Sequence, residues 1–143
     1  MTATYQQNKL QFQYPENWTL TDSPDELPRA ISLESPGGHV IWSVHLHPVE
    51  ADADEILDET IDALRESYKD LELSTESVDF DAFDGKAFGA LFFYLDFLVP
   101  IKLQVYSTPE YKILLWYQCE DRDFDKQEMV FRAISTTLMQ SLE

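Results

Sequence analysis

Residues 86–99 constrain the fold more than any other segment, because they are apolar on both parities of a strand. One parity carries Phe88, Phe92 and Tyr94, and the other carries Leu91, Phe93, Leu95 and Phe97. A strand that is apolar on both faces is typical of the centre of a sheet covered on both sides. Pro100 cannot donate a ladder hydrogen bond, so it predicts the end of this strand.

Shorter strands are predicted on either side of this run. Residues 9–14 alternate between polar and apolar, and residues 18–21 are predicted as their short partner across the turn at Pro15. The other predicted strands cover residues 30–34, 40–46, 71–80, 101–106 and 111–118. Asp84-Gly85 predicts a hairpin turn before the apolar run. Two prolines between Asp22 and Pro28 predict a loop.

Two segments have the period of an amphipathic helix. In residues 52–70 the buried stripe is Leu57, Ile61, Leu64 and Tyr68, and Asp52, three positions before Glu55, is the predicted N-cap. In residues 121–142 the stripe is Phe131, Ile134 and Leu138, with Asp121 or Asp123 as the N-cap.

This order of elements predicts one α+β domain over residues 1–143, with no internal boundary. We expect an antiparallel β-sheet covered by helices on both faces, a three-layer α/β/α sandwich.

The net charge of −17 limits the partners that the chain can bind. Nucleic acids and anionic membrane surfaces are polyanions, which would repel such a chain, so neither is an expected partner. The acidity has two remaining interpretations. It keeps the protein soluble, as a monomer or weak homodimer, or it attracts a protein with a basic surface.

A cytoplasmic location is predicted from the cysteine content and the first residues. The single Cys119 cannot form an internal disulfide. Residues 1–8 lack the basic start and apolar stretch of a signal peptide. A leader removed ahead of this sequence would change that expectation.

The chain resembles the PsbP-like superfamily. Residues 12–18 are similar to the F-x-x-P-x-x-W start of its members. The Phe83-Asp84-Gly85-Lys86 segment before a long apolar strand and the terminal helix are also similar, and the order of elements matches over nearly the whole chain. These motifs are structural, so no functional residue is carried over.

Members of this superfamily include photosystem extrinsic subunits, Ran-binding nuclear-import regulators, DcrB-like bacterial lipoproteins and secretion-effector chaperones. The resemblance implies an α/β/α sandwich whose members mostly bind other proteins rather than catalyse reactions. The absence of an export signal argues against the lipoprotein and photosystem branches.

Four carboxylates of the first predicted helix form the candidate partner-binding surface. Glu55, Glu59, Asp62 and Glu66 fall on the face opposite its buried stripe. They lie in a segment rich in acids, where only Arg65 and Lys69 are basic. Such a concentration steers a basic partner. An ordinary solvated helix face in an acidic protein has the same pattern.

His45 and His47 are a candidate metal pair, because they share one face of a strand. Polar residues on the less buried face of a strand give the same pattern. A metal site needs three or four ligands and the sequence shows only this pair, so we predict no metal and no cofactor.

No catalytic motif is present, so the chain is predicted not to be an enzyme. It contains no G-x-S-x-G, no H-E-x-x-H and no glycine-rich phosphate loop. Residues 79–85 fail the calcium-loop spacing by one residue. The predicted function is therefore that of a protein-interaction domain. The alternative is a binder of a small apolar ligand, in a pocket lined by Trp42, Phe92, Tyr94 and Trp116.

Overall fold

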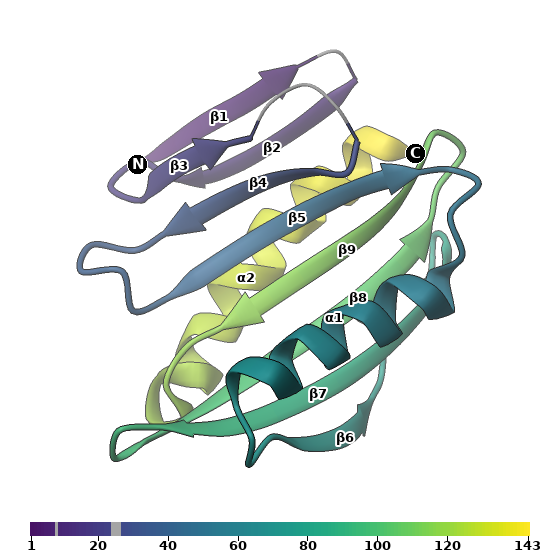
Figure 1. Ribbon diagram of the computed structural model, residues 1–143. Coiled ribbons are helices and arrows are strands. Elements are labelled where there is room, and N and C mark those ends of the chain that lie inside the picture. Colours follow the sequence, from purple (N-terminus) through teal and green to yellow (C-terminus); the bar gives the residue numbers. More distant parts are fainter. Residues whose placement is uncertain (8, 24–26) are drawn as a thin grey trace.

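The computed structural model describes residues 1–7, 9–23 and 27–143 (Figure 1). The elements are β1 (Thr2–Gln7), β2 (Leu10–Pro15), β3 (Thr19–Asp22), β4 (Arg29–Glu34), β5 (Ile41–Pro48), α1 (Ala53–Ser67), β6 (Glu72–Glu76), β7 (Asp84–Tyr94), β8 (Phe97–Ser107), β9 (Tyr111–Gln118) and α2 (Asp121–Leu142). The predicted α+β class with a large antiparallel sheet is confirmed.

The large sheet has the order β3-β4-β5-β9-β8-β7-β6, and every neighbouring pair is antiparallel. Strands β3, β4 and β5 form one side of the sheet in chain order. The chain then crosses over through α1 to β6 at the opposite edge. It returns strand by strand until β9 pairs with β5. This route places α1 beside β8 and leaves the last helix, α2, for the other face.

Side chains from the two faces of the sheet form two separate cores. On the face next to α1, which we call the α1 face, strand β8 contributes Ile101, Leu103 and Val105, which cluster with Leu57 and Leu64 of the helix. The opposite face, the α2 face, contains a larger cluster that includes Trp42, Tyr106, Tyr117, Phe131 and Leu138. Figure 1 shows α1 in front of the sheet and α2 behind it.

Helix α1 begins where the sequence predicts. The carboxylate of Asp52 accepts hydrogen bonds from the backbone N–H groups of Asp54 (2.8 Å) and Glu55 (3.3 Å), which satisfies two of the helix's free donors. The predicted end at Asp70 is wrong, because the backbone is already extended at Tyr68. The Tyr68 ring instead stacks on Phe92, with 3.8 Å between the ring centroids.

Helix α2 has the predicted bounds and the predicted buried stripe. Phe131, Ile134 and Leu138 are at most 2% exposed. The predicted N-cap at Asp121 or Asp123 is wrong: the cap position is Glu120, whose side chain makes no capping hydrogen bond.

The prediction for the N-terminal strands is partly wrong. Strand β2 pairs with β1, a strand that was not predicted, and not with residues 18–21. Most of that segment belongs to β3, which pairs with β4. The physical reason is that Tyr5 of β1 stacks on the buried Phe12, with ring centroids 4.9 Å apart. The loop predicted from Asp22 to Pro28 includes residues 24–26, which lie outside the described residues.

The apolar run at residues 86–99 is not one central strand. It contains the end of β7, a turn at Leu95 and Asp96, and the start of β8. Its outer part is therefore open to solvent, with Phe93 65% and Leu95 78% exposed. Strand β8 continues through Pro100. Its pairing with β9 begins only at Ile101, so the missing N–H of the proline leaves no hydrogen bond to β9 unmade.

Asp84-Gly85 is not a hairpin turn, because both residues belong to β7 and pair with β8. Gly85 is needed for a different reason: a Cβ atom there would lie 2.6 Å from the ring of Tyr106. The predicted polar strand at 71–80 shrinks to β6, and residues 77–83 connect the two strands across the α2 face. Val78, Phe80 and Phe83 of this connection pack against the larger core.

Candidate functional site

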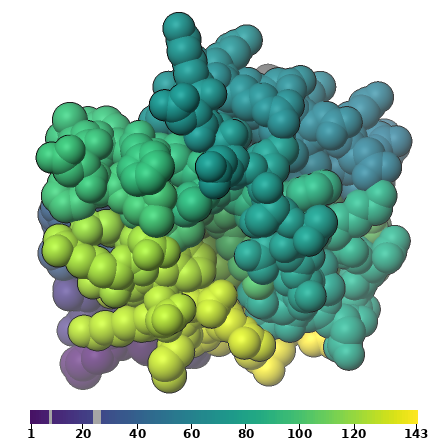
Figure 2. Space-filling view, turned by 90° about the horizontal axis from the view of Figure 1, so that it is seen from below, coloured from purple at the N-terminus to yellow at the C-terminus, as the bar shows by residue number. Residues whose placement is uncertain are grey.

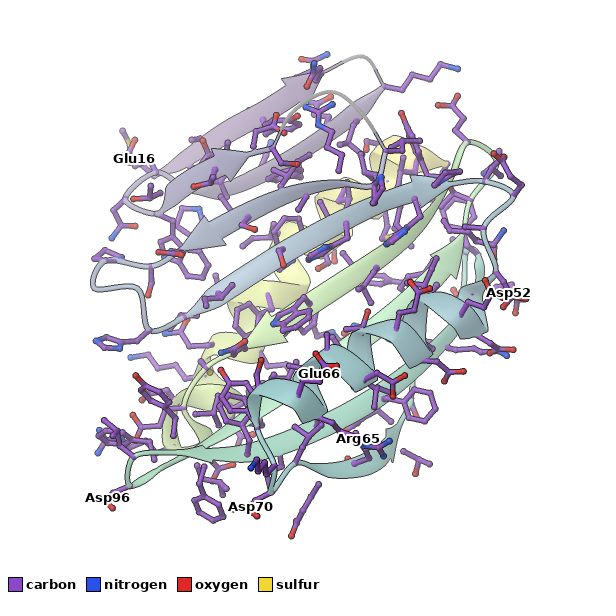
Figure 3. The ribbon with its side chains drawn as sticks, viewed as in Figure 1. Glu16, Asp52, Arg65, Glu66, Asp70 and Asp96 are labelled. Atoms are coloured by element: carbon purple, nitrogen blue, oxygen red, sulfur yellow. The ribbon has the colours of Figure 1, made fainter. Side chains whose placement is uncertain are left out.

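The outer face of α1 carries the four carboxylates predicted as a contact surface, here called the acidic stripe: Glu55, Glu59, Asp62 and Glu66. All four side chains are exposed. Among the described residues, no ion pair involves any of them. Figure 3 shows Asp52 and Glu66 toward opposite ends of the helix, so the stripe follows most of its length.

A groove runs beside α1 over the α1 face of the sheet. Its first part, with a volume of about 470 Å³, lies between Thr60, Ala63 and Ser67 of the helix and Trp116 of β9. Its second part, of about 630 Å³, lies between the β7–β8 hairpin and the starts of β5 and α2. Tyr68 and Gln118 line both parts, which therefore adjoin. We use the name groove for the two parts together.

Aromatic side chains of the β7–β8 hairpin line the second part of the groove. Phe92 is buried beneath Tyr68, whereas Tyr94 is 58% and Phe97 is 42% exposed. Figure 3 shows Asp96 at the outer end of this hairpin. Side chains of Phe93 and Leu95 are exposed there as well, but they do not line the groove.

Charged residues lie at both ends of the groove. Glu59 lines the part beside α1, and Glu120 and Asp123 line the part beside α2. Arg122 is the cation among the lining residues: its Nε lies 2.7 Å from Oε1 of Glu120, and its guanidinium lies over the Phe97 ring at 5.7 Å. Figure 2 shows the hairpin, in green, next to the start of α2, in yellow-green.

Three of the four aromatics predicted to line an apolar pocket do lie along the groove. Phe92 and Tyr94 line its second part, and Trp116 lines its first. Trp42 does not, because it pairs with Tyr117 and so shares the α2 face with that residue. There its indole Nε1 donates a hydrogen bond to Ser135 Oγ over 2.9 Å.

His45 and His47 share one face of β5, as predicted, and this is the α1 face; both are partly buried. The His45 ring stacks on Trp116 with centroids 6.0 Å apart, and its Nε2 lies 3.2 Å from Ser43 Oγ. Burial, helped by the proximity of His47, lowers the pKa of His45 to about 4. Burial also lowers the pKa of His47, against the opposing charge of Glu59.

In the described part of the chain, His45 and His47 are not joined by a third side chain that could complete a metal site. Within residues 1–7, 9–23 and 27–143, no group of three or more His, Cys, Asp or Glu side chains is arranged to hold a metal ion.

A buried polar network on the α2 face was not predicted from the sequence. Lys102 Nζ lies 2.8 Å from Oδ1 of Asp79, and Gln104 Nε2 donates to Oδ2 of the same carboxylate over 3.0 Å. The Gln104 carbonyl accepts hydrogen bonds from the Asp79 backbone and from the Tyr106 hydroxyl. In the described part of the chain no buried side-chain polar atom lacks a partner, so this network is fully hydrogen-bonded.

Cys119 is the only thiol in the chain, and it is buried beside the start of α2. Burial, with added repulsion from the acids at residues 120, 121 and 123, raises the pKa of the thiol to about 12. The nucleophilic thiolate is therefore disfavoured at neutral pH.

None of the helices in the described residues is long and apolar enough to span a membrane. No model of a known protein family matches the sequence, and no curated protein matches it.

Similarity to known proteins is found in solved structures. The solution structure of cyanobacterial PsbP (CyanoP) from Synechocystis sp. PCC 6803 aligns with a TM-score of 0.69 and 14% identity, covering 95% of this chain and 90% of that one. LpqN, involved in cell envelope biogenesis of Mycobacterium tuberculosis, aligns at 11% identity over 90% of this chain and 79% of that one, but its TM-score of 0.44 carries no argument. The predicted resemblance is therefore confirmed at the level of architecture, and the chain has a PsbP-like fold.

Proposed function

We propose that this chain is a non-catalytic module that binds a protein with a basic surface, and that the acidic stripe of α1 contacts this partner. The observation that carries the proposal is the exposure of all four carboxylates without a described ion-pair partner. A surface of one charge sign speeds the association of a partner of the opposite sign.

The charge balance supports a protein partner over other polyelectrolytes. At a net charge of −17, the chain would be repelled by nucleic acids and by anionic membranes. We propose a cytoplasmic monomer or weak homodimer, built as a three-layer α/β/α sandwich. The position of α1 and α2 on opposite sides of the sheet supports this layering.

The chemistry of the nucleophilic and basic groups supports a role without catalysis. The Cys119 thiol is buried with a raised pKa. Both imidazoles of the His45 and His47 pair have lowered pKa values caused by burial, and Lys102 is held in the buried network. None of these groups combines exposure with the pKa shift that activates a nucleophile.

A second candidate function is the binding of a small apolar ligand in the groove. The second part of the groove has a volume of about 630 Å³, within the usual range of small-molecule sites, and three of the predicted aromatics lie along the groove. A ligand that copurifies in native mass spectrometry and is lost on substitution of Tyr94 would favour this function.

The test is affinity capture from the native host's lysate by two variants of equal charge. In the stripe variant, Glu55, Glu59 and Glu66 become Gln and Asp62 becomes Asn. The control variant neutralises four exposed acids elsewhere: Glu16, Glu72, Glu76 and Asp125. We expect the stripe variant to recover at least fivefold less of the main partner at low salt, while the control recovers nearly as much as the wild type.

The stripe variant should also remain folded, which makes the comparison valid. Neighbours three or four residues apart in the stripe repel each other, so their neutralisation should raise the free energy of unfolding by about 1 kcal/mol in total. Equal losses in both variants would show that total charge, and not the stripe, governs capture. Undiminished capture by the stripe variant would refute the proposed contact.

A further inference from the structure

Building on the proposed protein-binding function, we propose that the second part of the groove receives an apolar segment of the partner that also carries arginine or lysine. In the unbound protein, Arg122 holds the position that a cation of this segment would take. The acidic stripe then attracts the partner, and the groove binds it.

The first argument is the apolar surface. The rings of Tyr94 and Phe97 are 58% and 42% exposed and line a hollow of about 630 Å³ above the buried Phe92. Val99 and Ile41 extend this apolar lining toward the sheet. Exposed aromatic side chains around a concave surface are typical of binding sites, because their burial by a partner removes a large apolar area from water.

The second argument is the charge around that surface. Glu120 and Asp123 line the part of the groove beside α2, and Glu59 lines the part beside α1. A segment lying along the groove would therefore meet a carboxylate at each end and aromatic rings between. Basic residues flanking apolar ones match this order, whereas an acidic segment would be repelled at both ends.

The third argument is the environment of Arg122. Its guanidinium lies 5.7 Å above the Phe97 ring while its Nε lies 2.7 Å from the Glu120 carboxylate. An aromatic face next to a carboxylate is a favourable site for a guanidinium or ammonium group. The Arg122 side chain is itself 72% exposed, so little packing would be lost when another cation replaced it.

The test uses three synthetic peptides of 14 residues, labelled with a fluorophore and followed by fluorescence anisotropy. The first peptide has leucines at helical spacing and lysine or arginine at the positions between them. The second replaces the basic residues with glutamate, and the third replaces the leucines with serine. We expect the first peptide to bind at least tenfold more tightly than either of the others, at low and at moderate salt.

Two substitutions locate the binding in the groove. The double variant Tyr94→Ser/Phe97→Ser should weaken binding of the first peptide at least tenfold. Phe93→Ser removes a ring of the same hairpin that is 65% exposed but lies outside the groove lining, so it should change binding less than twofold. Thermal unfolding of each variant shows whether the hairpin remains intact. If the double variant unfolds, Tyr94→Ser alone replaces it, with an expected loss of at least threefold.

Arg122→Gln is the sharpest variant, because the proposal predicts a gain. Removal of the internal cation should strengthen binding about threefold, the effect of one exposed cation–π contact. The exposed Lys126 lies on the same helix outside the groove lining, so Lys126→Gln controls for the change in total charge and should strengthen binding less. Equal gains in the two variants, or a loss in Arg122→Gln, would overturn the role of Arg122.

Amide chemical-shift mapping separates this proposal from the function on which it rests. Shifts at residues 92–99 and 118–123 support the groove. Shifts confined to the acidic stripe overturn the groove and leave the stripe as the contact. Equal binding of the glutamate peptide would indicate a groove for apolar ligands without charge preference, and equal binding of the serine peptide would indicate charge attraction alone; both overturn the proposal. If no peptide binds, the groove proposal is also overturned, while capture by the stripe and control variants still decides the proposed function.

Discussion

The two faces of the sheet differ in how completely their helices cover them. On the α2 face, Trp42, Tyr106, Tyr117 and Phe131 are fully buried and a polar network joins Lys102 to the connection at residues 77–83. On the α1 face, the cover ends before the sheet does, and Tyr94 and Phe97 remain open to solvent. We therefore expect the α2 face to contribute more to the free energy of unfolding than the α1 face, whose exposed part is where we propose that the partner binds.

The lengths of the helices explain this difference. At about 1.5 Å per residue, the 22 residues of α2 span about 33 Å and the 15 residues of α1 span about 22 Å. The 11-residue strands β7 and β8 are about 35 Å long, so α1 covers only part of them. The extended backbone at Tyr68 ends α1 where the two parts of the groove adjoin.

The largest effect is expected from Phe131→Ala on the α2 face. The Phe131 ring is fully buried and stacks on Tyr117, with 5.0 Å between centroids. Its truncation should lower the free energy of unfolding by about 3–5 kcal/mol in urea denaturation. Met129→Ala on the same helix, where the side chain is 74% exposed, should cost less than about 0.5 kcal/mol.

If Phe131→Ala has only a small effect, the assignment of stability to the α2 face is wrong. If Phe131→Ala stays folded but no longer binds the partner, the assignment of stability to the α2 face and of binding to the α1 face is also wrong.

A smaller loss of stability is expected when the pH is lowered, because of His45 on the α1 face. Its folded pKa of about 4 lies below the usual value of 6.5, so the unfolded chain binds the proton first as the pH falls. Stability is therefore fully present above about pH 6.5 and is lost between there and about pH 4, by on the order of 3 kcal/mol at most.

His45→Gln isolates this contribution. The difference in unfolding free energy between wild type and variant should shrink as the pH falls from 7 to 4.5, as followed by urea denaturation at each pH. Asp22, whose pKa is lowered mainly by its hydrogen bond from Arg29, titrates at lower pH and is common to both proteins. A difference that stays constant over this range would show that His45 is not held neutral by the fold.

Helical periodicity predicted the parts of the fold that depend on local sequence. The buried apolar residues of α2 and the N-cap at Asp52 both lie where the sequence predicts, because each depends on residues three or four apart. The turn at Leu95 was missed because this leucine adopts a left-handed backbone conformation (φ of 55°) without the glycine or asparagine that marks such a turn. Strand β1 was missed because its polar residues obscure the alternation of Ala3 and Tyr5.

The candidate site was less predictable, because its parts are far apart in the sequence. The acidic stripe follows from one helix and was found. The groove joins side chains of α1, β5, β7, β8, β9 and α2, and the pairing of β5 with β9 brings the two halves of the sheet together. No local pattern contains that pairing. Trp42 was misplaced for the same reason, since the face to which it points depends on the register of β5.

Hydrogen–deuterium exchange of the protein with and without its captured partner tests most directly whether binding belongs to the α1 face. We predict that the partner slows exchange in α1, in the β7–β8 hairpin and at residues 118–123, and leaves residues 124–142 of α2 and the β1–β2 hairpin unchanged. Slower exchange in residues 124–142 of α2 or in the β1–β2 hairpin, with α1 unaffected, would contradict the assignment of binding to the α1 face.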